Sequence, residues 1–239
     1  MIPWLADDNL LFPPLERALA EPNGLLAAGG DLSEARLLSA YRRGIFPWYN
    51  PGEPILWWSP DPRCVLLPDQ LHLSRSLRKR LRRNDYRVTF DQAFARVVRE
   101  CARPRPGQQG TWISRDIFTA YTNLHQRGVA HSVEVWVGDE LAGGLYGLAI
   151  GAVFFGESMF SRQRDASKTG FAWCVTQLRQ WGYQLIDCQV YNDHLASLGA
   201  SEMPRPEFAA QLARLCDLPL DHPWQFSITR EAICDDSQR

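Results

Sequence analysis

Residues 131–160 constrain the fold of this chain more than any other stretch, because they contain three consecutive strand-like runs with a turn between each pair. Their sequence is HSVEVWVGDELAGGLYGLAIGAVFFGESMF. Gly138 and Asp139 provide the first turn and Gly151 marks the second, a spacing typical of hairpins between antiparallel strands. A strand is expected before this meander at 86–90 and another after it at 183–190, with helices at 74–83, 91–101, 114–127, 166–181, 192–199 and from 206. A meander followed by helix, strand and helix predicts an α+β fold.

The first 62 residues differ from the rest in composition, because Pro, Gly and Trp recur in EPNGLLAAGGDLS and GIFPWYNPGEPILWWSPDP. One helix is expected there at 33–43, between Ser33 as its N-cap and Gly44 at its end. These features predict a small N-terminal α+β lobe at 1–62 and one larger domain at 63–239. A chain of 239 residues with 45% hydrophobic content is long enough to form both.

Cations are concentrated in SRSLRKRLRR at 74–83, which is expected to form a helix with a serine N-cap. Leu73, Leu77 and Leu81 recur every four residues, so one side packs on the core while the other sides carry charge. The cations are Arg75, Arg78, Lys79, Arg80, Arg82 and Arg83. Although the net charge of the chain is −1, residues 35–110 hold fifteen Lys and Arg against six Asp and Glu. The run is either a solvated helix face or a surface for a phosphate backbone, and the absence of interleaved acids favours the second.

Cysteine and histidine spacing argues against disulfides and metals. The six cysteines show neither C-x-x-C spacing nor a paired rhythm, which favours free thiols in a reducing compartment. The five histidines show no metal-ligand spacing, so no metal is expected. The N-terminus reaches Asp7 and Asp8 before any apolar stretch long enough for a signal sequence, and no later segment approaches the length of a membrane span. We therefore expect a cytoplasmic protein.

Three polar residues occupy expected strands in which apolar side chains are the rule. Asp187 and Gln189 lie two apart in LIDCQV, so their side chains share one face of the strand. A buried carboxylate beside an amide needs partners that offset its loss of hydration. The pair is either a hydrogen-bonded element that fixes strand register or part of a reactive site. Glu157, in FFGESMF, is either part of the same site or one half of an ion pair with a nearby cation, namely Arg162, Arg164 or Lys168.

Seven motifs are spread in order over most of the chain: EPNGLLAAGGDLS, YRRGIFPWYNPGEPILWWSPDPR, GTWIS, HSVEVW, GESMFS, ASKTG and LIDCQVYNDHLASLGA. In this order the chain resembles the leucyl/phenylalanyl-tRNA–protein transferase family. The resemblance implies an N-acetyltransferase-like mixed sheet with flanking helices in the larger, catalytic domain. It also implies an aminoacyltransferase that moves Leu, Phe and, less efficiently, Met from aminoacyl-tRNA to the N-terminal amine of proteins beginning with Arg or Lys. The products are marked for degradation by the N-end rule pathway.

The family uses this fold without a cofactor. In acetyltransferases, the coenzyme A pyrophosphate sits on a Q/R-x-x-G-x-G/A turn at a helix N-terminus. The corresponding turn here, SRQRDASKTG, lacks those glycines and carries Asp165. A conventional acyl-CoA acetyltransferase is therefore a weaker alternative. An RNA-binding module without catalysis is another, but it leaves Asp187, Gln189 and Glu157 without a role.

The resemblance points to Asp187 and Gln189 as the catalytic residues. An aminoacyl ester is already activated, so the enzyme has mainly to position the amine, accept a proton and stabilise an oxyanion. Gln189 is expected to hold the incoming amine, with Asp187 orienting its amide. The proton then passes to Asp187, a water or the departing ribose oxygen, because glutamine is no base near neutral pH. Glu157 is expected to bind the ammonium groups of the acceptor and the aminoacyl donor.

The remaining expected contacts are to the rest of the donor. Six residues are expected to form an apolar aminoacyl pocket and to contact the terminal adenosine, namely Trp48, Trp112, Tyr121, Leu145, Phe154 and Met159. The cation helix at 74–83 would then bind the tRNA backbone. The protein is expected to act as a monomer.

Overall fold

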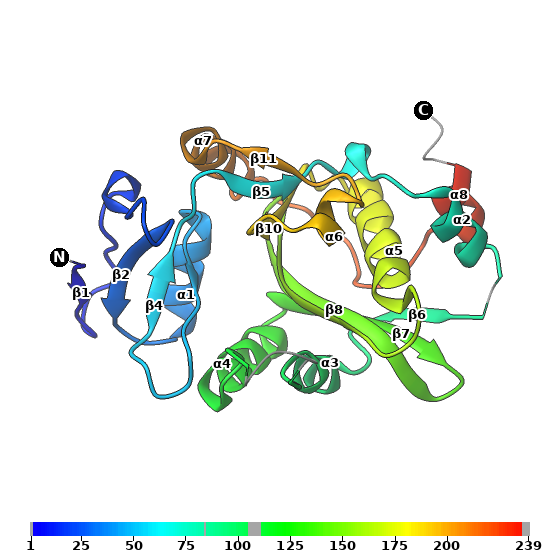
Figure 1. Cartoon of the computed structure of the whole chain (residues 1–239), viewed down its shortest axis with the longest axis horizontal. Coiled ribbons are helices and arrows are strands. Elements are labelled where there is room, and N and C mark those ends of the chain that lie inside the picture. The colour runs from blue at the N-terminus through cyan, green and yellow to red at the C-terminus, as the bar shows by residue number, and fades with distance from the viewer. Residues whose placement is uncertain (1, 84, 105–110, 236–239) are drawn as a thin grey trace.

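The computed structural model describes residues 2–83, 85–104 and 111–235, which form two sheets with helices packed around them (Figure 1). The smaller sheet has the order β1-β2-β4-β3 and comprises β1 (Trp4–Leu5), β2 (Leu25–Gly29), β3 (Phe46–Pro47) and β4 (Leu56–Trp58). The larger sheet has the order β11-β5-β10-β9-β8-β7-β6. Its strands are β5 (Arg63–Leu66), β6 (Arg87–Phe90), β7 (Ala130–Val137), β8 (Glu140–Ile150), β9 (Val153–Ser161), β10 (Leu185–Gln189) and β11 (Ser201–Met203).

Helices cover both faces of the larger sheet. The α-helices are α1 (Glu34–Arg42), α2 (Arg75–Leu81), α3 (Phe94–Cys101), α4 (Arg115–Gln126), α5 (Ala166–Trp181), α6 (Asp193–Ala196), α7 (Arg205–Leu215) and α8 (Arg230–Asp235), with two 3₁₀ turns at Leu15–Arg17 and Pro68–Gln70. The helix α5 packs on one face of β7 and β8, while α3 and α4 pack on the opposite face (Figure 1). The predicted α+β class, with a mixed sheet and flanking helices, is confirmed.

Local sequence signals explain the first helix and the meander. Ser33 caps α1 by accepting a hydrogen bond from the backbone N–H of Arg36. The two turns of the meander contain Gly138 and Gly151 at φ of 56° and 57°, a left-handed conformation that glycine adopts without steric cost. The strands β7, β8 and β9 pair antiparallel, as the turn spacing predicts.

The two central strands β9 and β10 are parallel, and their pairing ends partway along β9. The last paired residues are Phe155 and Asp187, although β9 continues to Ser161. On its other side β10 pairs antiparallel with β5, and the register shifts between Asp187 and Gln189. The backbone hydrogen bonds between β9 and β10 therefore end partway along β9, which leaves a break beside the centre of the sheet. At this break, strand ends and side chains take the place of backbone pairing.

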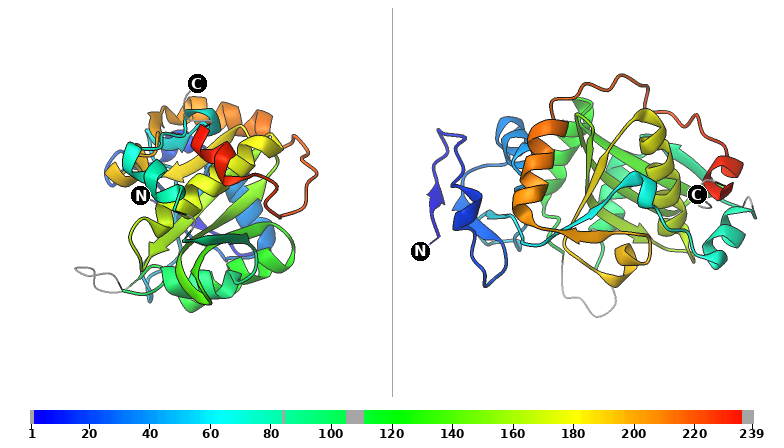
Figure 2. Two further views of the ribbon diagram at one scale, coloured as in Figure 1. Left: turned by 90° about the vertical axis from the view of Figure 1, so that its right-hand side faces the viewer. Right: turned by 90° about the horizontal axis from the view of Figure 1, so that it is seen from above.

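The two largest apolar cores lie on opposite faces of the larger sheet. The first contains Trp57 of the smaller sheet, Phe155 of β9 and Phe208 of α7, so it extends across both sheets. The second contains Leu145 and Phe154 together with the buried side of α5. In Figure 2, α7 lies beside the N-terminal segment, while α8 lies at the opposite end of the molecule. Because the first core is shared, the division of the chain after residue 62 stays a prediction.

Candidate active site

Glu157 occupies an irregularity in β9, close to the break in the sheet. Tyr146 of β8 pairs with Ser158 and Gly147 pairs with Gly156, so Glu157 is one residue more than the partner strand can match. Such a bulge changes the direction of a side chain relative to regular alternation. It allows a carboxylate to lie within a strand that is otherwise rich in aromatic residues.

The side chain of Glu157 is held by neutral hydrogen-bond donors. Its Oε1 accepts from the hydroxyl of Tyr41 at 2.6 Å and from Nε2 of Gln189 at 3.0 Å. Tyr41 is itself hydrogen-bonded to the hydroxyl of Tyr121. Both tyrosines are fully buried, and burial raises their pKa values well above the usual range. The cluster thus joins α1, α4, β9 and β10, which are distant in sequence.

The pKa of Glu157 is raised to about 8. Burial is the largest cause, and the negative charge of Asp187 acts in the same direction. Hydrogen bonds from Tyr41 and Tyr121 and the charge of Arg63 lower the pKa and only partly offset the burial. Glu157 therefore changes its protonation state near neutral pH, as a general base must.

Asp187 is fully buried and paired with Arg63, which is also fully buried. The guanidinium Nε lies 2.8 Å from Oδ1 of Asp187, and Nη2 lies 2.7 Å from Oδ2. This bidentate arrangement offsets the loss of hydration by both charges. Asp187 is therefore part of an ion pair rather than a free carboxylate.

Gln189 is at the end of β10, where the strand bends. Its φ is 62°, in the left-handed region that non-glycine residues rarely adopt. Its backbone N–H donates to Oδ1 of Asp187 at 2.9 Å. The structure brings Asp187 and Gln189 together as expected, but the contact differs from the expected one. Asp187 holds the backbone of Gln189, whereas Glu157 holds the side-chain amide.

Two of the cations considered as alternative partners of Glu157 pair elsewhere. Arg162 binds Glu100 at 2.5 Å, and Arg164 binds Asp165 at 3.6 Å. Among the described residues, no salt bridge to Glu157 is found, with Lys168 or with any other cation. The contacts found for the carboxylate among the described residues are therefore hydrogen bonds from neutral donors.

The residues expected in the aminoacyl pocket form two groups. Leu145 and Phe154 are buried in the second core, and Met159, which faces Leu145 across the β8–β9 pair, packs against that core. Trp112 and Tyr121 belong to the first core, on the other face of the sheet. Trp48 is 47% exposed and packs against Trp58. Cavities of about 400 and 490 Å³ are lined by other residues, so neither is the expected pocket.

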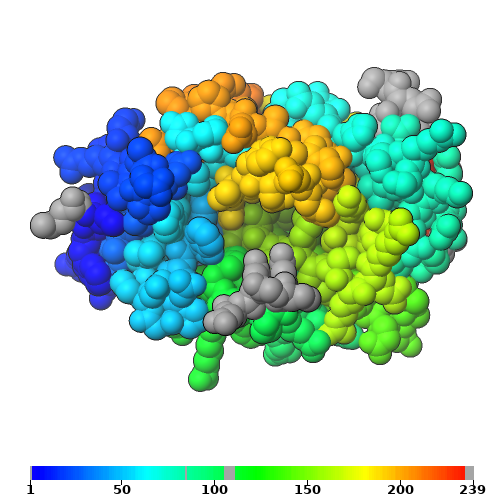
Figure 3. Space-filling view, viewed as in Figure 1, coloured from blue at the N-terminus to red at the C-terminus, as the bar shows by residue number. Residues whose placement is uncertain are grey.

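The residues that follow β10 are exposed, and the surface beside them is hollowed. In Figure 3 a hollow opens beneath the gold segment that carries β10 and α6, between it and the N-terminal part of the chain. Val190 and Tyr191, which follow Gln189, are about half exposed at 51% and 49%. Gln189 therefore lies at the boundary between the buried ion pair and the surface.

The predicted cation helix is confirmed as α2, with Ser74 as its N-cap. Its leucines Leu77 and Leu81 are buried in the second core. Four cations are exposed, namely Arg75, Lys79, Arg82 and Arg83, whereas Arg78 and Arg80 are half-buried. Arg80 pairs with Asp85 and its guanidinium lies 4.2 Å from the ring centre of Tyr86. The exposed four form a positive surface at the end of the molecule opposite the N-terminus (Figure 1).

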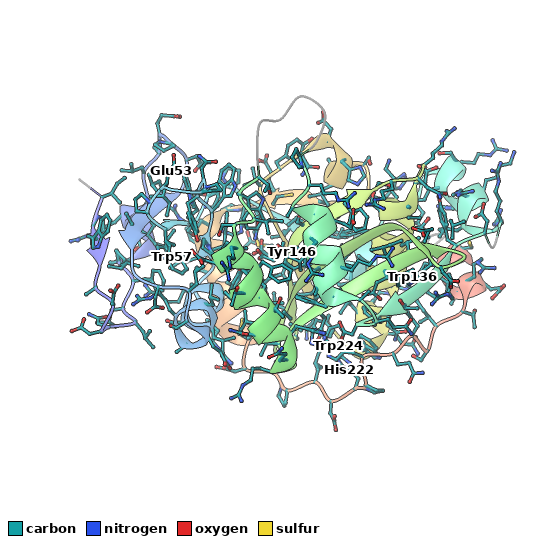
Figure 4. The ribbon with its side chains drawn as sticks, turned by 90° about the horizontal axis from the view of Figure 1, so that it is seen from below. Glu53, Trp57, Trp136, Tyr146, His222 and Trp224 are labelled. Carbon is teal, nitrogen blue, oxygen red and sulfur yellow. The ribbon has the colours of Figure 1, made fainter. Side chains whose placement is uncertain are left out.

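Sequence reasoning missed three residues of the site. Tyr41 and Arg63 both lie within the motif-rich N-terminal third, but their partners are 116 and 124 residues away. Tyr146, on β8, lies near the centre of the molecule (Figure 4). Its ring packs edge-on against Tyr121, and its buried hydroxyl has no hydrogen-bond partner among the described residues. Only their position in quoted motifs singled out Tyr41 and Arg63, and nothing identified their contacts.

The described residues contain neither a candidate metal site nor a helix that could span a membrane. Within residues 2–83, 85–104 and 111–235 there is no group of three His, Cys, Asp or Glu placed to hold a metal ion. None of the helices in those ranges has both the length and the apolar character needed to cross a membrane.

The chain matches two family models. Residues 30–61 match the N-terminal domain of leucyl/phenylalanyl-tRNA protein transferase, and residues 65–213 match leucyl/phenylalanyl-tRNA protein transferase itself. Among solved structures, L-PGS from Bacillus licheniformis aligns with 72% of this chain and 57% of its own at 10% identity. Its TM-score of 0.38 is too low to support an argument.

Two curated relatives are similar over almost the whole chain. The leucyl/phenylalanyl-tRNA–protein transferase of Cellvibrio japonicus is 61% identical over 93% of this chain and 95% of its own. That of Stutzerimonas stutzeri is 62% identical over 94% of this chain and 100% of its own. With these relatives and a family model that matches more than half of its residues, the chain belongs to the leucyl/phenylalanyl-tRNA–protein transferase family.

Proposed function

We propose that this chain transfers Leu, Phe and, less efficiently, Met from aminoacyl-tRNA to the N-terminal amine of proteins that begin with Arg or Lys. The observation that carries the proposal is the contact between Gln189 and Glu157, an amide held by a carboxylate beside a break in the sheet. Membership of the family makes the chain an aminoacyl-tRNA–protein transferase, which supports the finer assignment. The modified proteins then become substrates of N-end rule degradation.

Gln189 is suited to hold the acceptor amine. Its Nε2 is already engaged by Glu157, which leaves the carbonyl oxygen of the amide to accept a hydrogen bond from the incoming amine. The donor ester needs no covalent nucleophile, so positioning the amine against it supplies much of the rate. A fixed amide is preferable here to a mobile one, because reacting atoms must be held close together.

Glu157 is the best candidate for the proton acceptor. Asp187 is engaged by three hydrogen-bond donors, two from Arg63 and one from the backbone of Gln189, so its oxygens are already occupied. Glu157, with a pKa raised to about 8, accepts a proton near neutral pH. An approaching ammonium group lowers that pKa again, so Glu157 also attracts the cationic acceptor.

The other proposed partners and the proposed location are inferred from the exposed residues and from the cysteines. The exposed cations of α2 are proposed to contact the tRNA backbone. Six residues are proposed to contact the aminoacyl-adenosine end, namely Trp48, Trp112, Tyr121, Leu145, Phe154 and Met159. All six cysteines are free thiols, which supports a reducing, cytoplasmic location. A monomer is the state we expect.

The proposed function is tested with radiolabelled Leu-tRNA and two peptides that differ only in their first residue, Arg or Ala. We expect label in the Arg peptide alone, because a cationic acceptor lowers the pKa of Glu157 and is attracted by the resulting carboxylate. Labelled acetyl-CoA in place of Leu-tRNA should give no product. Transfer from acetyl-CoA, equal labelling of both peptides, or tRNA binding without any transfer would each contradict the proposal.

The role of Glu157 predicts a pH dependence. Since only the ionised carboxylate accepts a proton, kcat/KM should rise with pH, reach half of its maximum near pH 8 and level off above it. Tyr41→Phe removes a hydrogen bond that lowers the pKa of Glu157, so the rising limb should move to higher pH. The measurement is the initial rate of peptide labelling from pH 6 to 9.5, corrected for spontaneous ester hydrolysis.

Two controls separate this effect from others. The acceptor amine itself titrates near pH 8, but its pKa does not change with the protein variant. Tyr183→Phe removes another buried tyrosine hydroxyl, one that contacts His222, and should leave the limb in place. If Tyr41→Phe gives the parent profile, Glu157 does not control the limb.

Neutralising the exposed cations of α2 and of the residues that directly follow it should weaken binding of charged tRNA. In the triple variant with Arg75, Lys79 and Arg83 changed to Gln, Kd should rise and its salt dependence should flatten, with the logarithmic slope falling by about 1 for each lost phosphate contact. Transfer from a minimal aminoacyl-adenosine donor should be nearly unchanged.

The matched control has the same change in net charge elsewhere on the surface, with Arg17, Arg127 and Arg214 changed to Gln. It should keep the parent Kd and slope. If the first triple variant loses as much transfer with the minimal donor as with charged tRNA, α2 is a structural element. If the control variant changes Kd and slope equally, the effect comes from net charge alone.

A further inference from the structure

Arg63 is a fully buried arginine whose every nitrogen is engaged. Its Nε and Nη2 bind the two oxygens of Asp187, and its Nη1 donates to the carbonyl oxygen of Gly44 at 2.9 Å. The guanidinium carbon lies 4.7 Å from the ring centre of Phe46 and 4.8 Å from that of Phe208. A planar cation held by three acceptor atoms between two rings has no rotational freedom.

The contacts of Arg63 connect parts of the chain that are far apart in sequence. Arg63 opens β5, Asp187 lies on the neighbouring strand β10, and Gly44 follows α1. Phe46 belongs to the smaller sheet and Phe208 to α7. The orientation of Asp187 is therefore fixed relative to the N-terminal segment as well as to the larger sheet.

The carboxylate that Arg63 fixes controls the backbone of Gln189. Oδ1 of Asp187 accepts both from Nε of Arg63 and from the backbone N–H of Gln189. A left-handed φ at a non-glycine residue is unfavourable and persists only where its surroundings enforce it. If Gln189 reverted to an extended conformation, its side chain would change direction and leave Glu157.

We infer that Arg63 is a positioning residue for the transfer reaction, which acts through Asp187 to hold Gln189 in the bend that presents its amide to Glu157. The inference rests on the proposed function, because it assigns the amide a role in holding the amine. Arg63 has no substrate contact in this scheme. Its contribution is the direction of one amide group.

A contribution to stability does not by itself explain a buried pair such as Arg63 and Asp187. Replacing both partners of a buried ion pair by apolar residues of similar size is often neutral or stabilising, whereas removing one partner leaves a buried charge unpaired. The two roles therefore predict different results for the single and double replacements. A structural pair can be exchanged for an apolar pair without loss of turnover, but a positioning pair cannot.

The experiment compares Arg63→Met, Asp187→Leu and the double variant. Thermal unfolding is measured together with kcat and KM for the minimal donor and the Arg peptide, below the melting temperature of each variant. We expect both single variants to melt well below the parent and the double variant to recover most of that loss. In all three, kcat should fall at least tenfold while the KM for the donor stays within about twofold. The double variant should lose no more turnover than either single variant, because both residues act through the same amide.

Arg36→Met provides the matched control. Arg36 is the other arginine that is 0% exposed among the described residues, and it binds Asp31 and the backbone of Ala6 and Asp7, away from the cluster. Its replacement should lower the melting temperature but leave kcat at the parent value wherever the protein is folded. Arg63→Lys covers the case in which the apolar variants do not fold: it keeps the charge but cannot bind both oxygens in plane, and should lower kcat with a smaller loss of stability.

Two results would overturn the inference. One is parent-level kcat in a folded Arg63→Met, Arg63→Lys or double variant. The other is an equal loss of kcat in Arg36→Met, which would make the effect a general consequence of losing a buried arginine. Neither result affects the proposed function, which fails instead if the parent protein does not transfer Leu to the Arg peptide.

Discussion

The site depends on one buried ion pair, in which the guanidinium of Arg63 binds both carboxylate oxygens of Asp187. Removing either charge from water is costly, and only close, well-oriented contacts offset that cost. The two hydrogen bonds of 2.8 and 2.7 Å provide such contacts, and the remaining capacity of Oδ1 is used by the backbone of Gln189. An interaction that neutralises a charge thereby also determines the shape of the strand end.

Glu157 differs from Asp187 in the partners that hold it. Two carboxylates lie near each other, but only one has a cation of its own. The other is surrounded by tyrosine hydroxyls and an amide, which stabilise its charge less than a guanidinium does. Asp187 is tied to Arg63 and to the backbone of Gln189, while Glu157 is the carboxyl group whose pKa is raised to about 8. The different partners of two acids of similar intrinsic pKa are the basis of the different roles that we propose for them.

Sequence patterns predicted the parts of this fold that are determined locally. The turns at Gly138 and Gly151 and the cap at Ser33 each depend on residues a few positions apart. The short strands of the smaller sheet carried no such signal, because strands of two to five residues show little periodicity. At the site, alternation predicted that Asp187 and Gln189 lie together, but the bulge between them and the contact with Arg63 depend on tertiary structure. No local pattern reveals a partner 124 residues away.

The central claim is that the carboxylate of Asp187 holds the backbone N–H of Gln189, and hydrogen exchange of that single amide tests it most directly. Gln189 is a strand-end residue next to Val190 and Tyr191, which are exposed, so without this bond its amide would exchange like that of a surface loop. The measurement is the native-state exchange rate of the Gln189 amide by NMR, compared with the rate for an unstructured peptide of the same sequence. The account predicts exchange slowed by at least two orders of magnitude, similar to neighbouring amides within β10. Exchange at the peptide rate would show that Gln189 is not held in its bend, and would contradict the account.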